Sequence, residues 1–123
     1  MQMNNSMNMM NNSVLETDLA LLRRNAESIV RAIPAGTKLL PVLKCDAYGL
    51  GAAEIARVLE PLEAVAGFAV AHVSEGLALR RAGITKDLLV MSSALPWQLS
   101  AAVDADLTLT CGRAGFASEL QAA

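Results

Sequence analysis

A lysine stands where a short apolar run ends and a glycine-containing turn begins. Residues 39–43 (Leu-Leu-Pro-Val-Leu) are apolar, Lys44 follows them directly, and Tyr48 comes just before Gly49-Leu50-Gly51. A neutral lysine amine can condense with the aldehyde of a cofactor to form a Schiff base. A tyrosine hydroxyl can donate to a phosphate, and glycine lets the backbone approach a ligand closely. The pattern indicates a cofactor lysine; its structural alternative is a surface lysine whose stem covers the strand end.

For the other residues that could take part in chemistry, the surrounding sequence gives weaker support. The two glycines of the turn resemble half of a dinucleotide fingerprint, but Glu54 occupies the third glycine position. His72 follows a predicted strand without an evident partner, which is typical of a structural histidine. Cys45 and Cys111 lack CxxC spacing, so we expect packed, reduced thiols and no metal site.

Two further groups are expected to serve the fold. Glu75 together with Arg80 or Arg81 is typical of a solvated helix face. Trp97 is expected in the core or as a cap over the sheet.

The elements that must position Lys44 alternate between strands and helices. Apolar residues at helical spacing predict a first helix from Leu19 to Ile33, capped by Thr17 or Asp18 and ended by Pro34. The other predicted elements are strands at 39–43, 67–71, 87–91 and 107–111, and helices at 52–59, 74–82, 93–102 and 112–123. This alternation is typical of βα units in a parallel sheet. Chemistry in such proteins gathers at the carboxyl ends of the strands, and the glycine turn would open the helix at residue 52 toward an anion.

Composition sets the class of protein. The chain has 123 residues, 54% of them hydrophobic, and a formal net charge of −2, which suits one domain with its own core. The absence of a basic block argues against nucleic-acid binding, and no apolar run is long enough for a membrane span. With no secretory signal and no paired cysteine motif, we expect a cytoplasmic protein. Residues 1–13 contain only Met, Asn, Ser and Gln and are predicted to form a disordered leader before a domain at 14–123.

The segment around Lys44 resembles the cofactor-lysine motif of the alanine racemases. Residues 41–51 read Pro-Val-Leu-Lys-Cys-Asp-Ala-Tyr-Gly-Leu-Gly, and the family motif is V-V-K-A-N-A-Y-G-H-G. Further segments similar to the family lie at residues 15–25, 68–71, 75–84 and 88–91. The departures are Cys45-Asp46 in place of Ala-Asn and Leu50 in place of His, beside the lysine rather than at it.

The resemblance implies a fold-type III enzyme that uses pyridoxal 5′-phosphate (PLP) to interconvert L- and D-alanine, which supplies D-alanine for peptidoglycan. It implies that Lys44 carries PLP and is the base on one face of the substrate, that Tyr48 contacts the phosphate, and that Val42 and Met91 line the cofactor ring. Members of the family are homodimers in which a tyrosine of the partner subunit serves the opposite face. The implied fold is α/β, about the first half of a (β/α)8 barrel without the C-terminal β domain.

Half a barrel leaves open strand edges and an uncovered apolar face. We therefore expect this chain to be an N-terminal fragment that does not racemise alanine alone. The alternatives are another fold-type III enzyme (a serine racemase or amino-acid decarboxylase), a non-enzymatic PLP carrier, and a non-catalytic α/β binding module with a complete open sheet.

Overall fold

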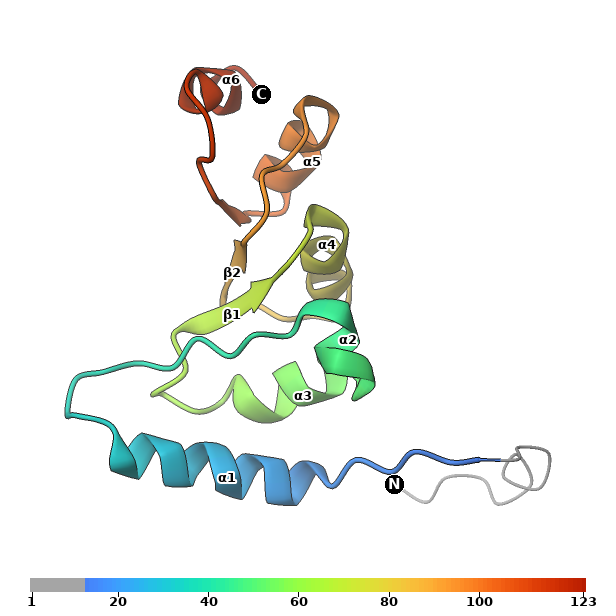
Figure 1. Cartoon of the computed structure of the whole chain (residues 1–123), viewed down its shortest axis with the longest axis vertical. Coiled ribbons are helices and arrows are strands. Elements are labelled where there is room, and N and C mark those ends of the chain that lie inside the picture. The colour runs from blue at the N-terminus through green and yellow to red at the C-terminus, as the bar shows by residue number, and fades with distance from the viewer. Residues whose placement is uncertain (1–12) are drawn as a thin grey trace.

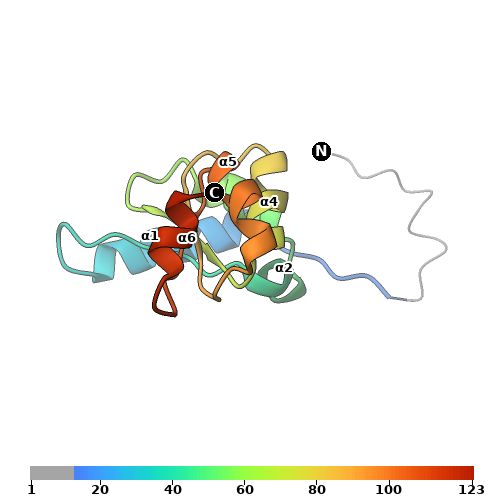
Figure 2. The same cartoon turned by 90° about the horizontal axis from the view of Figure 1, so that it is seen from above.

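The computed structural model describes residues 13–123 as a sheet with helices packed along one face (Figures 1 and 2). The elements, in chain order, are α1 (Leu19–Ala32), α2 (Lys44–Gly49), α3 (Ala52–Leu59), β1 (Gly67–Val70), α4 (Val73–Arg81), β2 (Asp87–Val90), the 3₁₀ turn η2 (Pro96–Gln98), α5 (Leu99–Asp104), β3 (Thr108–Leu109) and α6 (Phe116–Gln121). The predicted leader lies, except for Ser13, outside the described residues.

Helix α1 begins at the predicted Leu19 and ends at Ala32, one residue before the predicted Ile33. The Asp18 side chain caps it by accepting the Leu21 backbone N–H at 2.8 Å, and the chain becomes extended at Ile33, just before Pro34. Its apolar face includes Leu19 and Leu22, which pack on the core. The helix lies alongside α3 (Figure 1).

The sheet is parallel, and its strands are neighbours in chain order. The order is β1-β2-β3, with Phe68 opposite Leu88 and Leu89 opposite Thr108. Strands of an open doubly wound sheet reverse their order at a switch point, whereas each strand of a barrel neighbours the next one along the chain. The sequential order of this partial parallel sheet therefore agrees with the predicted first part of a barrel.

The predicted strand at 39–43 is extended beside β1 but forms only two isolated bridges. Leu39 lies opposite Val65, and Val42 lies opposite Ala69, so the offset between partners grows by one residue along the pair. Such a shift is a bulge, which interrupts a ladder. Pro41 adds to the interruption because it has no N–H to donate. On one side of the bulge the segment hydrogen-bonds to Ala64 and Ala66, just before β1, and on the other side to Ala69 of β1, so it forms an irregular edge strand.

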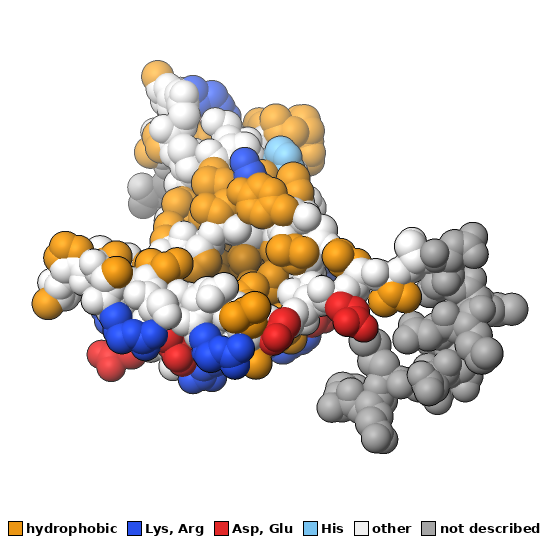
Figure 3. All heavy atoms as spheres, turned by 60° about the horizontal axis from the view of Figure 1, so that its bottom comes forward, with side chains coloured by type: hydrophobic (Ala, Val, Ile, Leu, Met, Phe, Trp, Pro, Cys, Tyr) orange, Lys and Arg blue, Asp and Glu red, His pale blue; other side chains and the backbone are white. Residues whose placement is uncertain are grey.

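The two faces of the sheet have different surroundings. One face packs against the helices with fully buried side chains, among them Phe68, Val70, Leu88 and Val90. Val42 and Met91 do not belong to that core, and they are 39% and 38% exposed. Exposed apolar side chains gather across the middle of the face shown in Figure 3. The side of the sheet that would line a barrel is thus apolar and open in this chain.

Several predicted boundaries and one burial were wrong. Helix α4 begins at Val73 rather than Ser74, and the α-helix predicted at 93–102 begins at Leu99 after the 3₁₀ turn. The fourth strand is shortened to β3, and the last helix spans only α6. Trp97 is 77% exposed, because the 3₁₀ turn that carries it lies on the surface instead of against the sheet.

Within residues 13–123, no helix is both long and apolar enough to cross a bilayer. The same residues contain no group of three or more His, Cys, Asp or Glu side chains placed to hold a metal ion.

Candidate functional site

Lys44 lies at the carboxyl end of the edge strand, directly after the buried Leu43. Its side chain is half-buried, and its Nζ lies 5.9 Å from the centre of the Tyr48 ring. Within residues 13–123, no ion pair or hydrogen bond engages this amine. The structure therefore brings the two predicted polar site residues together and leaves the amine available to a ligand.

The element α2, which begins at Lys44, is a left-handed turn rather than a right-handed helix. Cys45, Asp46, Ala47 and Tyr48 have φ angles between 53° and 59°, and a glycine at φ 85° comes next. A left-handed helical conformation costs roughly 1–2 kcal/mol for each non-glycine residue. Such strain persists only where surrounding contacts impose it, and it is commonly found at functional sites. The turn sets the direction in which both Lys44 and Tyr48 leave the backbone.

Asp46 joins this turn to the first turn of α3. Its Oδ1 accepts the Ala52 backbone N–H at 2.8 Å, and its carbonyl oxygen accepts the Gly51 N–H at 3.0 Å. Gly51, at φ 93°, is the N-cap residue of α3. The sequence predicted that this helix terminus would be open to an external anion. In the structure, the chain's own carboxylate takes the first of those N–H groups.

Glu75 holds the turn from the other side. Its Oε1 accepts the backbone N–H of Cys45 at 2.6 Å, while its Oε2 accepts those of Ala71 and His72 at 2.7 Å and 3.0 Å. Burial pushes the pKa of this carboxyl upward, but the three backbone N–H groups outweigh burial and leave the pKa below its usual range. The prediction of a solvated helix face was wrong for Glu75.

Arg80 also belongs to the fold rather than to a solvated face. Its guanidinium donates to four backbone carbonyl oxygens, those of Ile84, Lys86, Ala105 and Asp106. It therefore ties α4 to the turns before β2 and β3.

Val42 and Met91 lie on the open face near Lys44. Val42 pairs with Ala69, which pairs in turn with Leu89 of β2, and Met91 follows two residues later. The Met91 N–H donates to the Val70 carbonyl oxygen at 2.9 Å, which keeps Met91 in register with the end of β1. The intervening side chain on β1 is the methyl group of Ala69, which is 1% exposed.

His72 and Cys45 differ from their expected settings. His72 has a partner that the sequence did not reveal, since its Nδ1 lies 3.2 Å from Ser92 Oγ. The Ser92 hydroxyl donates to the Ala71 carbonyl oxygen, so the pair ties the ends of β1 and β2 together. Cys45 is exposed rather than packed, and both it and Cys111 are free thiols.

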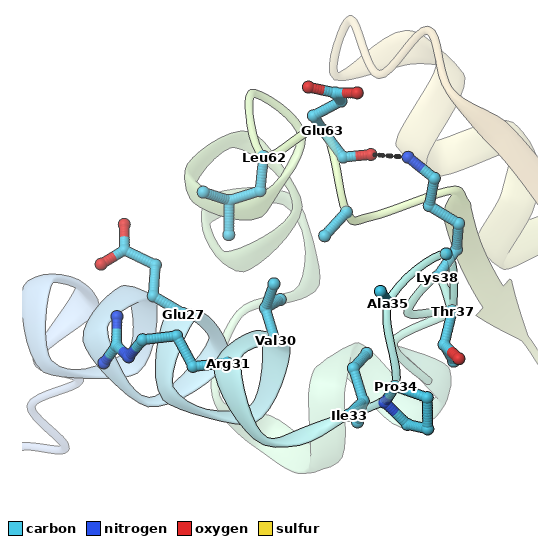
Figure 4. A pocket seen from close by; sticks show the side chains of 12 residues that line it. Glu27, Val30, Arg31, Ile33, Pro34, Ala35, Thr37, Lys38, Leu62 and Glu63 are labelled. Atoms are coloured by element: carbon cyan, nitrogen blue, oxygen red, sulfur yellow. Dashed lines mark hydrogen bonds between the residues drawn. The ribbon is translucent and has the colours of Figure 1, made fainter.

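A cavity of about 500 Å³ lies at the other end of the edge strand (Figure 4). It is an open pocket lined by the end of α1, the turn after it and the segment before β1, and Lys38 donates to the Glu63 carbonyl oxygen there at 2.9 Å. A smaller groove of about 280 Å³ runs beside α1, with Val42 and Tyr48 in its wall. The larger cavity is thus remote from Lys44, whereas the smaller one touches two predicted site residues.

Comparisons with known proteins match this chain to part of the alanine racemases. The family model described as "Alanine racemase, N-terminal domain" matches residues 17–123. An alanine racemase of Geobacter sulfurreducens is 45% identical over 86 residues, which cover 70% of this chain and 22% of that protein. One of Streptococcus pyogenes is 37% identical over 98 residues, covering 80% and 26%. The solved alanine racemase of Clostridium difficile 630 in complex with cycloserine superposes with a TM-score of 0.78 at 33% identity, covering 82% and 28%. The chain thus spans about a quarter of the length of these relatives.

Proposed function

This chain belongs to the alanine racemase family, and on that premise we propose that it carries the cofactor lysine of a PLP-dependent racemase acting on alanine. The observation that carries the proposal is the setting of Lys44. Its amine lies at the carboxyl end of a parallel strand, faces the Tyr48 ring and has no hydrogen-bond or ion-pair partner within residues 13–123.

The residues present fit the chemistry of PLP. An amine is required to attach its aldehyde, a hydroxyl donor suits its phosphate, and apolar side chains suit the two sides of its ring. Lys44, Tyr48, Val42 and Met91 supply this set from adjoining segments, and Tyr48 is 64% exposed, so its hydroxyl is accessible. Bound PLP supplies an electron sink for the Cα carbanion of an amino acid.

In the proposed reaction, Lys44 first holds the cofactor and then moves a proton at Nζ. The free amine takes the Cα proton from one face of the amino acid or returns it there, depending on the direction. Tyr48 anchors the phosphate and so fixes the distance between Nζ and the reacting carbon. Val42 and Met91 keep water from the ring on the open face of the sheet.

A second base is needed on the opposite face of the substrate. The chain contains one tyrosine, Tyr48, which the proposal places at the phosphate. We therefore expect the 123-residue chain to attach PLP without racemising alanine, and we expect the enzyme that contains it to be a homodimer. Its product would be D-alanine for peptidoglycan, made in the cytoplasm, a setting that the two free thiols support.

The proposal is tested by adding PLP to the purified chain. We expect an absorbance band at about 420 nm, which is typical of an imine of a lysine amine. Borohydride should then fix PLP on the protein, and a peptide map should locate it on Lys44. Lys44→Arg keeps the positive charge but should lose both signals. Lys38→Arg, at the other end of the strand, is the matched control and should retain them. Labelling of other lysines to the same extent as Lys44 would contradict the proposal.

A further inference from the structure

The carboxylate of Glu75 connects two segments that are thirty residues apart in the chain. Cys45 donates to one of its oxygens, and the N–H groups of Ala71 and His72 donate to the other. The Cys45 N–H belongs to the peptide unit that begins with the Lys44 carbonyl carbon. A hydrogen bond to that N–H therefore restrains the backbone at Lys44 itself.

We propose that Glu75 is a positioning residue that fixes the left-handed turn, and with it the Lys44 amine, against the carboxyl end of β1. The inference rests on the proposed role of Lys44 and adds to it the group that holds that lysine in place. Four consecutive non-glycine residues with positive φ do not keep this conformation unaided. A strong acceptor anchored on another element supplies the missing restraint.

Two hydrogen bonds hold the Glu75 carboxylate to α4 and to the end of β1. Glu75 lies in the first turn of α4, and its bond to the His72 N–H is the helix-capping contact of that turn. Its second contact, to the Ala71 N–H, lies at the end of β1. The carboxylate is thus fixed to the helix and the strand at once, and Cys45 is the one donor among the three that belongs to the Lys44 turn.

Asp46 completes the restraint from the α3 side. It lines the same small cavity of about 180 Å³ as Glu75, together with apolar residues of α3 and α4. Its own hydrogen bond goes to Ala52, which holds the end of the turn rather than its start. Glu75 is therefore the acceptor that acts next to Lys44.

Glu60 offers a matched control. It too accepts several hydrogen bonds with one carboxylate, from the backbone N–H groups of Thr85 and Lys86 and from the Thr85 hydroxyl. These contacts join the end of α3 to the turn before β2, at the opposite end of the strands from Lys44. All three of these donors share Oε1 of Glu60, whereas Glu75 uses both of its oxygens. Glu60→Gln therefore controls for loss of a multiply hydrogen-bonded carboxylate away from the site, while Glu75→Gln also removes an acceptor oxygen next to Lys44.

The first experiment needs no cofactor. Backbone hydrogen exchange is measured for Cys45 in the wild-type chain and in both variants. Glu75→Gln should expose Cys45 to exchange about tenfold faster or more, because a glutamine can turn only one acceptor oxygen toward three donors. Glu60→Gln should leave Cys45 unchanged. An unprotected Cys45 amide in the wild type, or equal acceleration by both variants, would overturn the proposal.

The second experiment measures how fast borohydride-stable PLP accumulates on Lys44, at a temperature where each variant is fully folded. Attachment should slow about tenfold in Glu75→Gln and should match the wild type in Glu60→Gln. Equal slowing in the two variants would assign Glu75 to general stability and overturn its positioning role. If the wild type itself does not attach PLP, the proposed function fails, while the exchange experiment still decides the role of Glu75.

Discussion

The Oδ1 atom of Asp46 accepts the backbone N–H of Ala52 at 2.8 Å. The N-cap position of α3 is a glycine, which has no side chain to accept this hydrogen bond. Asp46, six residues before Ala52, supplies the acceptor instead, because the left-handed turn folds the chain back toward the helix. The turn and the helix therefore depend on each other.

Replacing Asp46 tests this dependence. Asp46→Ala should destabilise the chain by about 1 kcal/mol, the usual cost of losing a helix cap. Asp46→Asn keeps an acceptor oxygen and should retain most of the stability. Urea unfolding followed by circular dichroism gives both values. Equal losses in the two variants would show that the contact to Ala52 contributes little.

Cys45→Gly tests the strain in the left-handed turn. Cys45 is exposed and has a φ angle of 54°, so glycine should relieve the conformational cost and raise the unfolding free energy by about 0.5–1 kcal/mol. Ala101→Gly, on the exposed side of the right-handed helix α5, is the comparison and should lower it by about 0.5–1 kcal/mol. Destabilisation by both glycines would argue against strain at Cys45. Chemical unfolding of the two variants measures the difference.

Acid should destabilise the chain through Glu60 and Glu75. Burial raises the pKa of Glu60, but hydrogen bonds from Lys86 and Thr85 outweigh it, and the net pKa lies below the ordinary value of 4.5, as for Glu75. The folded state therefore binds fewer protons than the unfolded state in this range. The stabilisation is present above about pH 4.5 and is lost as the pH falls through the lowered values.

Unfolding free energies measured between pH 7 and pH 3 test this. As the pH is lowered, the unfolding free energy of the wild-type chain should decrease. It should decrease less in the double variant Glu60→Gln, Glu75→Gln, whose amides do not titrate. A double variant with the same slope as the wild type would assign the acid sensitivity to other carboxyls.

Phe68 and Trp97 should respond in opposite ways to truncation. Phe68 is 0% exposed in the centre of β1, so Phe68→Ala should cost about 3–5 kcal/mol. Trp97 is 77% exposed, so Trp97→Ala should change stability by no more than about 0.5 kcal/mol. Thermal unfolding of both variants measures the contrast. A large loss at Trp97 would mean that the turn carrying it packs on the chain in solution.

Local sequence signals sufficed where local contacts decide the structure. The bounds of α3 follow from a glycine turn before it and Pro61 after it, and the end of α1 follows from Pro34. The left-handed turn could not be predicted in this way, because non-glycine residues reach positive φ only through contacts with distant segments. The bulge beside Pro41 depends likewise on its pairing with β1.

The sequence indicates Lys44 and Tyr48 as candidate site residues but does not reveal the side chains that hold their turn. Lys44 and Tyr48 follow from the type and spacing of residues after an apolar run. Glu75 was missed, although it stands three residues after His72 at the start of a helix, the spacing of a capping box. That signal places Glu75 at the helix terminus, but its contact with Cys45 depends on the tertiary fold.

The sequential strand order has a consequence for synthesis on the ribosome. Leu39 pairs with Val65, Gly67 with Asp87, and Leu89 with Thr108, so each pairing involves only the segment made just before it. Between residues 39 and 109, each of these pairings joins neighbouring segments of the chain and none joins segments far apart in translation. Each βα unit can dock vectorially as it emerges, with the Lys44 segment serving as the first edge and later units growing away from it.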